Sequence, residues 1–144
     1  PWATGPDFYE DRAPGGWYDI PFDCFWFNPH PAWGSYDPSL DDDPTWTLTQ
    51  AGSSETVTLE LPEGVVYEVG VHYFQQTGEP AEARVRVYLY NQLVYETPVV
   101  ELNALDMWEV LTIEWPTGKV VVTEDDEGGW KVIPGYQNPY FIPL

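Results

Sequence analysis

Residues 65–96 constrain the fold more than any other part of this chain, because their apolar and polar side chains alternate with the period of a β-strand. Successive strand side chains face opposite sides of a sheet, whereas a helix would scatter the same residues around its axis. The apolar set in the first half is Tyr67, Val69, Val71 and Tyr73, and the opposite set is Glu68, Gly70 and His72. This half therefore predicts a strand with one buried face.

The alternation resumes after a break at Gly78 and Pro80. The next apolar face is Val85, Val87 and Leu89, and the residues opposite are Arg84, Arg86 and Tyr88. The two halves together predict a β-hairpin of half-buried strands. Such strands need a second layer over them, which favours a β-sandwich over a parallel α/β core. We expect Arg84 and Arg86 to pair with acids of the N-terminal segment or of adjacent strands, so that their face is covered.

Strand patterns continue through the rest of the central region. The predicted strands are residues 46–50, 56–61, 65–74, 83–90, 93–101, 107–115, 119–123 and 130–133. Turn sequences such as Pro116-Thr117-Gly118 separate them at the spacing of a sandwich. Only residues 102–106 fit a single helical turn. The predicted fold class is all-β, an immunoglobulin-like or jelly-roll antiparallel β-sandwich of about eight strands.

Both ends of the chain are rich in proline and aromatic residues and follow neither the strand nor the helix period. We expect a Pro/aromatic-rich N-terminal arm with an acidic loop at residues 1–44, a sandwich domain at 45–133 and a C-terminal arm at 134–144. Each aromatic side chain can remove about 150–250 Å² from water, so the arms should pack on a surface. That surface is either their own sandwich, which we favour, or a neighbouring subunit.

The charge of the chain limits its partners. It has 24 acidic residues and five basic ones, for a formal net charge of −19. A phosphate-binding surface needs clustered Lys and Arg, so we expect no nucleic-acid partner. Anionic membranes are disfavoured in the same way, and no apolar run approaches the roughly 20 residues that a membrane helix needs. The acidity also fits adaptation to high salt, ordinary solubility or the binding of cations.

One acidic loop is a candidate calcium site. Its carboxylates are Asp37, Asp41, Asp42 and Asp43. Calcium takes six to eight oxygen ligands from flexible loops of this kind. The spacing lacks the alternating acids and central glycine of a helix-loop-helix calcium loop. We therefore favour a solvated acidic turn, keep Ca²⁺ as the alternative cofactor, and interpret the second cluster, residues 125–127, as a turn between strands.

Catalytic patterns are weak throughout the sequence. The two histidines, His30 and His72, have no cysteine or second histidine at zinc-ligand spacing. We expect His72 to be a hydrogen-bonded structural residue. No Gly-x-Ser-x-Gly nucleophile motif is present, and no pair of carboxylates stands out from the many acids. The single cysteine, Cys24, is expected to be a buried thiol. The sequence predicts that the protein is not an enzyme.

An ordered series of segments resembles a known family. These are residues 69–74 (VGVHYF), 83–88 (ARVRVY), 93–96 (LVYE), 106–110 (DMWEV) and 113–116 (IEWP), preceded by the acidic residues 37–43 (DPSLDDD). The series resembles a poorly characterised β-sandwich domain of bacterial secreted and cell-surface proteins, often found beside von Willebrand A-type adhesion modules. The resemblance covers residues 23–116. It implies an extracellular, non-enzymatic module and brings no catalytic residues.

Two functions remain open. The first is an extracellular structural or surface-assembly subunit, for example of a filament or layer, whose arms dock on neighbouring copies. Its candidate self-association residues are Trp2, Phe8, Tyr9, Trp17, Tyr18, Tyr136, Tyr140 and Phe141. The second is a monomeric carbohydrate- or calcium-binding module of a larger secreted protein, with an exposed row formed by several of Trp17, Trp26, Trp33 and Trp130. The start at Pro1 suits a processed mature chain or an excised domain equally.

Overall fold

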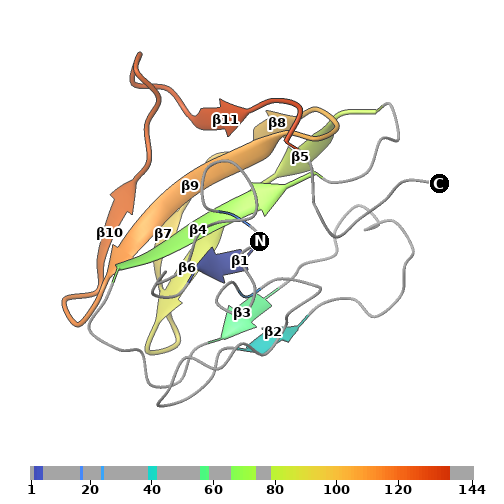
Figure 1. The fold of residues 1–144 in the computed structure, drawn as a ribbon. Helices are drawn as coiled ribbons and strands as arrows, with labels where there is room; N and C mark the ends of the chain where they lie inside the picture. The colour runs from blue at the N-terminus through green and yellow to red at the C-terminus, as the bar shows by residue number, and fades with distance from the viewer. Residues whose placement is uncertain are drawn as a thin grey trace.

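The computed structural model describes residues 2–4, 17, 24, 39–41, 56–58, 66–73 and 79–136. In these residues it contains eleven β-strands and no helix (Figure 1). All of the strand pairings are antiparallel. The predicted all-β sandwich class is therefore confirmed. None of the described residues forms a helix long and apolar enough to cross a membrane.

The strands are short and follow one another along the chain. They are β1 (Trp2–Thr4), β2 (Ser39–Asp41), β3 (Thr56–Thr58), β4 (Val66–His72), β5 (Ala81–Ala83), β6 (Arg86–Leu89), β7 (Gln92–Glu96), β8 (Val100–Leu102), β9 (Met107–Glu114), β10 (Lys119–Val122) and β11 (Lys131–Ile133). The longest, β4 and β9, pair with each other and form the middle of a five-stranded sheet. Strand β1 lies along the free side of β4. On the other side of β9, β10 pairs with its C-terminal half and β11 with its N-terminal half (Figure 1).

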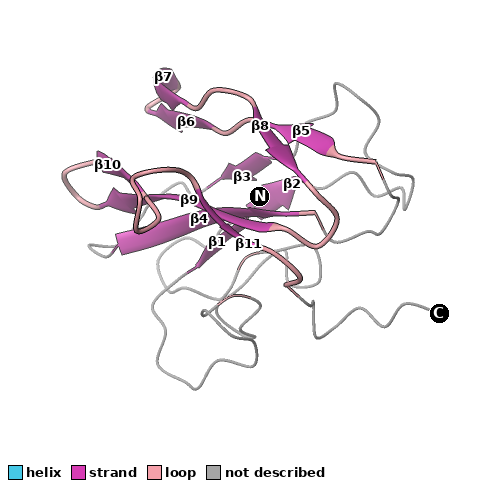
Figure 2. Ribbon diagram, turned by 90° about the horizontal axis from the view of Figure 1, so that it is seen from above, coloured by secondary structure: helices cyan, strands magenta, loops and turns pink. Residues whose placement is uncertain are grey.

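A second layer lies over one face of this sheet. It is a long two-stranded ribbon in which β5 pairs with β8 and β6 pairs with β7 (Figure 2). The buried residues between the layers are Val85, Val87, Leu102, Trp108, Val110 and Leu111. Val69, Val71 and Tyr73 of the β4 region pack against them, which is the face that the sequence alternation assigned to the interior. The core therefore joins β4 and β9 to the ribbon.

A β-bulge in β9 explains a break in its own alternation. Val69 pairs with Leu111 and the next residue, Gly70, pairs with Glu109, so Val110 is the additional residue. Strict alternation would send Val110 and Leu111 to opposite faces, whereas both are buried in the core. A bulge places two residues against one on the partner strand and shifts the phase of the side chains beyond it. The sequence step from Trp108 and Val110 to Leu111 and Ile113 encodes this shift.

The predicted hairpin between residues 65–74 and 83–90 is wrong. Strand β4 pairs with β1 and β9, and the observed hairpin is β6–β7 instead. Its two-residue turn consists of Tyr90 and Asn91, with φ angles of 51° and 63°. Positive φ at both central residues is the geometry of a type I′ turn, which matches the right-handed twist of hairpin strands. The chain thus makes a tight turn at Tyr90 and Asn91, while the break at Gly78 and Pro80 separates strands of different layers.

Other strand predictions agree with the structure in part. The single strands expected at 83–90 and 93–101 are each divided in two, as β5 and β6 and as β7 and β8. The segment expected to be irregular, residues 1–44, contains β1 and β2. Residues 102–106 form a hydrogen-bonded turn without a helix, in which Asp106 N donates to Asn103 O. The strand expected at 46–50 lies outside the described residues.

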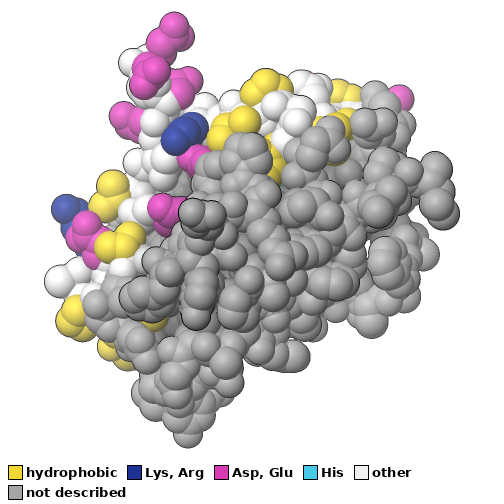
Figure 3. Space-filling model, in the orientation of Figure 1, with side chains coloured by type: hydrophobic (Ala, Val, Ile, Leu, Met, Phe, Trp, Pro, Cys, Tyr) yellow, Lys and Arg dark blue, Asp and Glu magenta, His cyan; other side chains and the backbone are white. Residues whose placement is uncertain are grey.

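The loop between β10 and β11 is an acidic turn, as predicted. The carboxylate of Asp125 accepts hydrogen bonds from the backbone N–H groups of Glu127 and Gly129, at 2.9 and 2.8 Å. Gly128 has a φ of 81°, a conformation that glycine adopts without steric cost. The loop projects from the body of the molecule, and Asp and Glu side chains gather on it (Figures 1 and 3).

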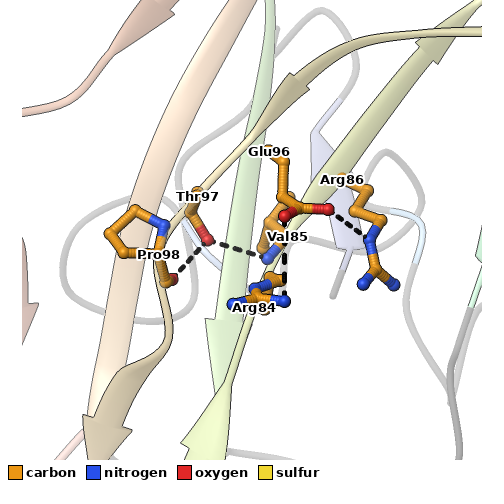
Figure 4. Close-up of polar contacts among 6 residues, drawn as sticks. All are labelled: Arg84, Val85, Arg86, Glu96, Thr97 and Pro98. Atoms are coloured by element: carbon orange, nitrogen blue, oxygen red, sulfur yellow. Dashed lines mark hydrogen bonds and ion pairs between the residues drawn. The ribbon is translucent and has the colours of Figure 1, made fainter.

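A side-chain hydroxyl connects the two halves of the ribbon. Between the paired segments, Arg84 and Val85 on one strand lie opposite Thr97, Pro98 and Val99 on the other. Proline has no N–H to donate, so the regular ladder stops here. The Thr97 hydroxyl accepts a hydrogen bond from Val85 N at 3.0 Å and donates one to Pro98 O at 2.8 Å (Figure 4). Thr97 N also donates to Val85 O, which keeps the two strands together.

Candidate functional site

The face of the five-stranded sheet that points away from the ribbon holds parts of both chain ends. Alternation along β4 places Gly70 and His72 on this face, opposite the core residues Val69 and Val71. Glu109 is paired with Gly70, and Lys131 is paired with Glu109 in β11. We call Gly70, His72, Glu109 and Lys131 the arm-binding face, because residues from both arms pack on them.

Trp17 of the N-terminal arm packs directly on Gly70. A Cβ atom built on Gly70 would lie 2.8 Å from Cη2 of Trp17 and 3.1 Å from two further carbons of the ring. Those distances leave no room for any side chain at position 70. Trp17 is only 1% exposed, so the indole is enclosed by its own chain. A glycine inside a strand commonly marks such a close approach.

The indole is also held by a charged pair. Trp17 Nε1 donates to Glu109 Oε1 at 3.0 Å, and Lys131 Nζ lies 2.7 Å from Glu109 Oε2. The hydrogen bond and the negative charge of Glu109 raise the pKa of Lys131 above its usual value. Both oxygens of Glu109 therefore have a partner. This arrangement fixes the arm on the sheet.

A pocket of about 340 Å³ lies beside this contact. Its lining residues come from the arm and from four strands or their ends, namely Trp17, Glu68, Val69, Glu109, Leu111, Thr112, Thr123 and Lys131. The volume is within the range of small-molecule sites, but the lining is polar and apolar in about equal parts, where such sites are mostly apolar. Two of its three charged residues, Glu109 and Lys131, form an ion pair, and Glu68 is the third. The pocket thus continues the contact between arm and sheet.

His72 holds the C-terminal end on the same face. His72 Nε2 donates to Tyr136 O at 2.8 Å, and the two rings meet edge to face with centroids 5.7 Å apart. Tyr136 N donates to Leu105 O at 2.8 Å. Burial lowers the pKa of His72 to about 4, against the opposite effects of nearby carbonyl groups and of Asp106. The histidine is hydrogen-bonded, as predicted, and is neutral at pH 7.

Replacing Gly70 with alanine should destabilise the protein by about 1–3 kcal/mol, because the new methyl group overlaps the Trp17 ring and the indole must move. The free energy of unfolding in urea measures this effect. In a Trp17→Ala background the same Gly70→Ala change should have almost no cost, since the overlapping ring is gone. Equal costs in the two backgrounds would show that the ring does not limit position 70.

Only one of the candidate calcium ligands, Asp41, lies within the described residues. Asp41 is the last residue of β2, and its backbone pairs with Thr56 of β3. Asp37, Asp42 and Asp43 lie outside the described residues. Within the described ranges, no group of three or more His, Cys, Asp or Glu side chains is arranged to hold a metal ion.

Three of the eight candidate self-association residues lie within the described residues. Trp2 belongs to β1, where it pairs with Gly70. Trp17 and Tyr136 are both buried against their own chain. Phe8, Tyr9, Tyr18, Tyr140 and Phe141 lie outside the described residues. The arm therefore contacts its own sandwich at two points, β1 and Trp17, which is the arrangement favoured by the sequence.

Two of the four tryptophans proposed for an exposed carbohydrate-binding row, Trp17 and Trp130, pack against other parts of the protein. Trp17 is buried, and Trp130 packs edge to face on the core residue Trp108, with ring centroids 5.4 Å apart. Trp26 and Trp33 lie outside the described residues. Cys24 is fully buried, in agreement with a buried thiol.

Glu109 and Lys131 were not predicted as site residues from the sequence. Nothing in the local sequence marks them, because Trp17 and Glu109 are 92 residues apart in the chain. The glycine at position 70 was the one local signal of a close packing partner. Comparison with family models, with curated proteins and with solved structures finds no match to this chain.

Proposed function

We propose that this protein is a non-enzymatic, extracellular structural subunit that assembles with copies of itself through its arms. One observation carries the proposal: the strand at the beginning of the chain, β1, adds to the edge of the main sheet along β4. The pairing involves three residue pairs, from Trp2 with Gly70 to Thr4 with Glu68. Addition of an extended segment to a sheet edge is a common mode of recognition between chains.

The same hydrogen bonds form whether β1 comes from the same chain or from a neighbour. Exchange of an identical element between copies therefore costs little, provided that the connecting segment reaches. Trp17 would extend the contact, because its ring fits the bare backbone at Gly70 and its N–H is matched by Glu109. A donated arm would thus bring main-chain pairing, an aromatic contact and a charge-assisted hydrogen bond.

Charge opposes this assembly and sets its conditions. Copies with a net charge of −19 repel one another at low ionic strength. At about 1 M salt the Debye length is only about 3 Å, so this repulsion is largely screened. Assembly through main-chain pairing and aromatic burial should therefore strengthen as salt increases.

Deleting residues 1–22 should convert assemblies to monomers, because the deletion removes both β1 and Trp17. Light scattering of the intact and truncated chains at 0.15 M and 1 M salt measures the change in particle mass. Circular dichroism of the truncated chain checks that the sandwich persists. Assemblies of unchanged mass would rule out arm docking.

A cysteine pair identifies which chain donates the arm. Paired residues of antiparallel strands have Cα atoms about 4.5–5.5 Å apart, within the range of a disulfide. Thr4→Cys with Glu68→Cys, in a Cys24→Ser background, should give cross-linked oligomers on oxidation if β1 is exchanged. The single Thr4→Cys variant is the matched control.

A further inference from the structure

The outer face of the β6–β7 hairpin combines exposed apolar side chains with two arginines. Tyr88 and Leu93 pair across the strands and are 58% and 50% exposed. Arg86 Nε lies 2.7 Å from Glu96 Oε2, and Arg84 Nη1 lies 3.7 Å from Glu96 Oε1 (Figure 4). We call these five residues the hairpin face. The arginines pair with an acid of the adjacent strand, as the sequence predicted, but the face is exposed and not covered.

The hairpin face has the opposite sign of charge from the rest of the molecule. Two arginines and one glutamate give it a formal charge of +1, in a chain whose net charge is −19. The hydrogen bond from Arg86 lowers the pKa of Glu96, which favours the ionised carboxylate. A cationic face with exposed apolar residues is complementary to an acidic partner. A second copy of this chain, with its net charge of −19, offers such an acidic surface.

The β10–β11 loop is the acidic element best placed to reach such a face. It projects from the body of the molecule, and acidic side chains gather on it (Figure 3). The Asp125 carboxylate is used within the loop, where it accepts the N–H groups of Glu127 and Gly129. Asp126 and Glu127 are exposed at the turn. The internal hydrogen bonds hold the turn in one shape, which lowers the entropy that binding would cost.

We propose that the hairpin face of one copy binds the β10–β11 loop of a second copy, with Arg84 and Arg86 facing Asp126 and Glu127. The inference rests on the proposed assembly function and names a contact for it. The two surfaces are different patches of the same chain, so the contact is head-to-tail. A head-to-tail contact that does not close into a ring adds further copies and produces a filament.

A charge exchange tests the contact. Variant one is Arg84→Glu with Arg86→Glu, and variant two is Asp126→Lys with Glu127→Lys. Each variant alone places like charges across the contact, so its association measured by light scattering at 0.15 M salt should weaken at least about tenfold. An equimolar mixture should recover association, because each reversed surface then meets its complement and each native surface meets a native one.

Matched controls separate local contact from total charge. Lys119→Glu makes the chain more acidic by two charges at another exposed position, half the change of variant one. Glu79→Lys with Glu114→Lys makes the chain less acidic by the same four charges as variant two. A mixture of these two controls should not show the recovery of association that is expected for the mixture of variants one and two. Circular dichroism and urea unfolding of both charge-exchange variants check that they are folded.

The outcomes are distinct. If the unaltered chain assembles and the mixture of variants does not recover association, the proposed contact is wrong while the assembly function stands. The proposed contact is also wrong if either variant assembles as well as the unaltered chain. It is likewise wrong if the hairpin face binds an acidic partner other than the loop. A chain that stays monomeric at every salt concentration overturns both the contact and the proposed function.

Discussion

Acidification from pH 7 to pH 4 should remove about 3 kcal/mol of folding stability through His72 alone. Burial lowers the pKa of this histidine to about 4 in the folded protein, from 6.5 in an exposed chain. Above pH 6.5 both states are neutral at this residue and the stability is fully present. Between pH 6.5 and 4 the unfolded chain binds the proton and the folded chain does not, so stability falls with falling pH.

The replacement His72→Gln isolates this effect. Glutamine retains a side-chain N–H that can donate to Tyr136 O, but it does not titrate. The free energy of unfolding in urea, measured at pH 7, 5.5 and 4, should fall less steeply for the variant than for the unaltered chain. The carboxylates titrate in both proteins and cancel in the difference.

The other histidine supplies the control. His30→Gln removes one imidazole and leaves the His72 side chain unchanged. It should retain the acid sensitivity assigned to His72. Parallel pH profiles for the unaltered chain and for His72→Gln would contradict a buried, neutral His72.

Replacing Thr97 with valine should destabilise the protein by about 2 kcal/mol, because valine has nearly the same shape but no hydroxyl. The Val85 N–H would then be buried with no acceptor, and Pro98 O would lose its donor. Thr97 itself is 1% exposed, so water cannot replace the missing group without opening the ribbon. The midpoint of urea unfolding measures the loss of stability.

Serine at the same position is the matched control. Thr97→Ser keeps the hydroxyl and removes a methyl group, at a cost of roughly 1 kcal/mol for one buried carbon. Hydrogen exchange adds a local measurement, since the Val85 amide should exchange faster in Thr97→Val than in Thr97→Ser. If serine destabilises the protein as much as valine does, packing and not the hydroxyl holds the ribbon together.

The alternation of residues 65–74 was sufficient to predict strand β4 and its buried face, and the pattern at 107–115 predicted strand β9 without its faces. The alternation also predicted the all-β class, because a half-buried strand requires a covering layer. Partner choice was not predicted. The nearest apolar strand in the sequence was taken as the partner of β4, whereas β9 pairs with it across a longer stretch of chain. Alternation reports which face is buried and carries no information about which strand lies alongside.

The candidate site shows the same division. Gly70 in a strand and His72 on its polar side could be recognised from the sequence as residues with a packing or hydrogen-bonding role. Their partners could not, because Trp17 and Tyr136 come from distant segments. The exposed state of the hairpin face was likewise a property of the whole molecule.

The sequence by itself determined the strand periodicity and the acidic charge, since each depends on residue types and their near neighbours. Only the tertiary structure decided that β1 and Trp17 lie against β4, that Glu109 joins Trp17 to Lys131, and that the two arginines remain at the surface. These contacts depend on which segments the common core brings together. Packing between segments far apart in the chain depends on the apolar area that many side chains bury together. No local sequence pattern therefore encodes it.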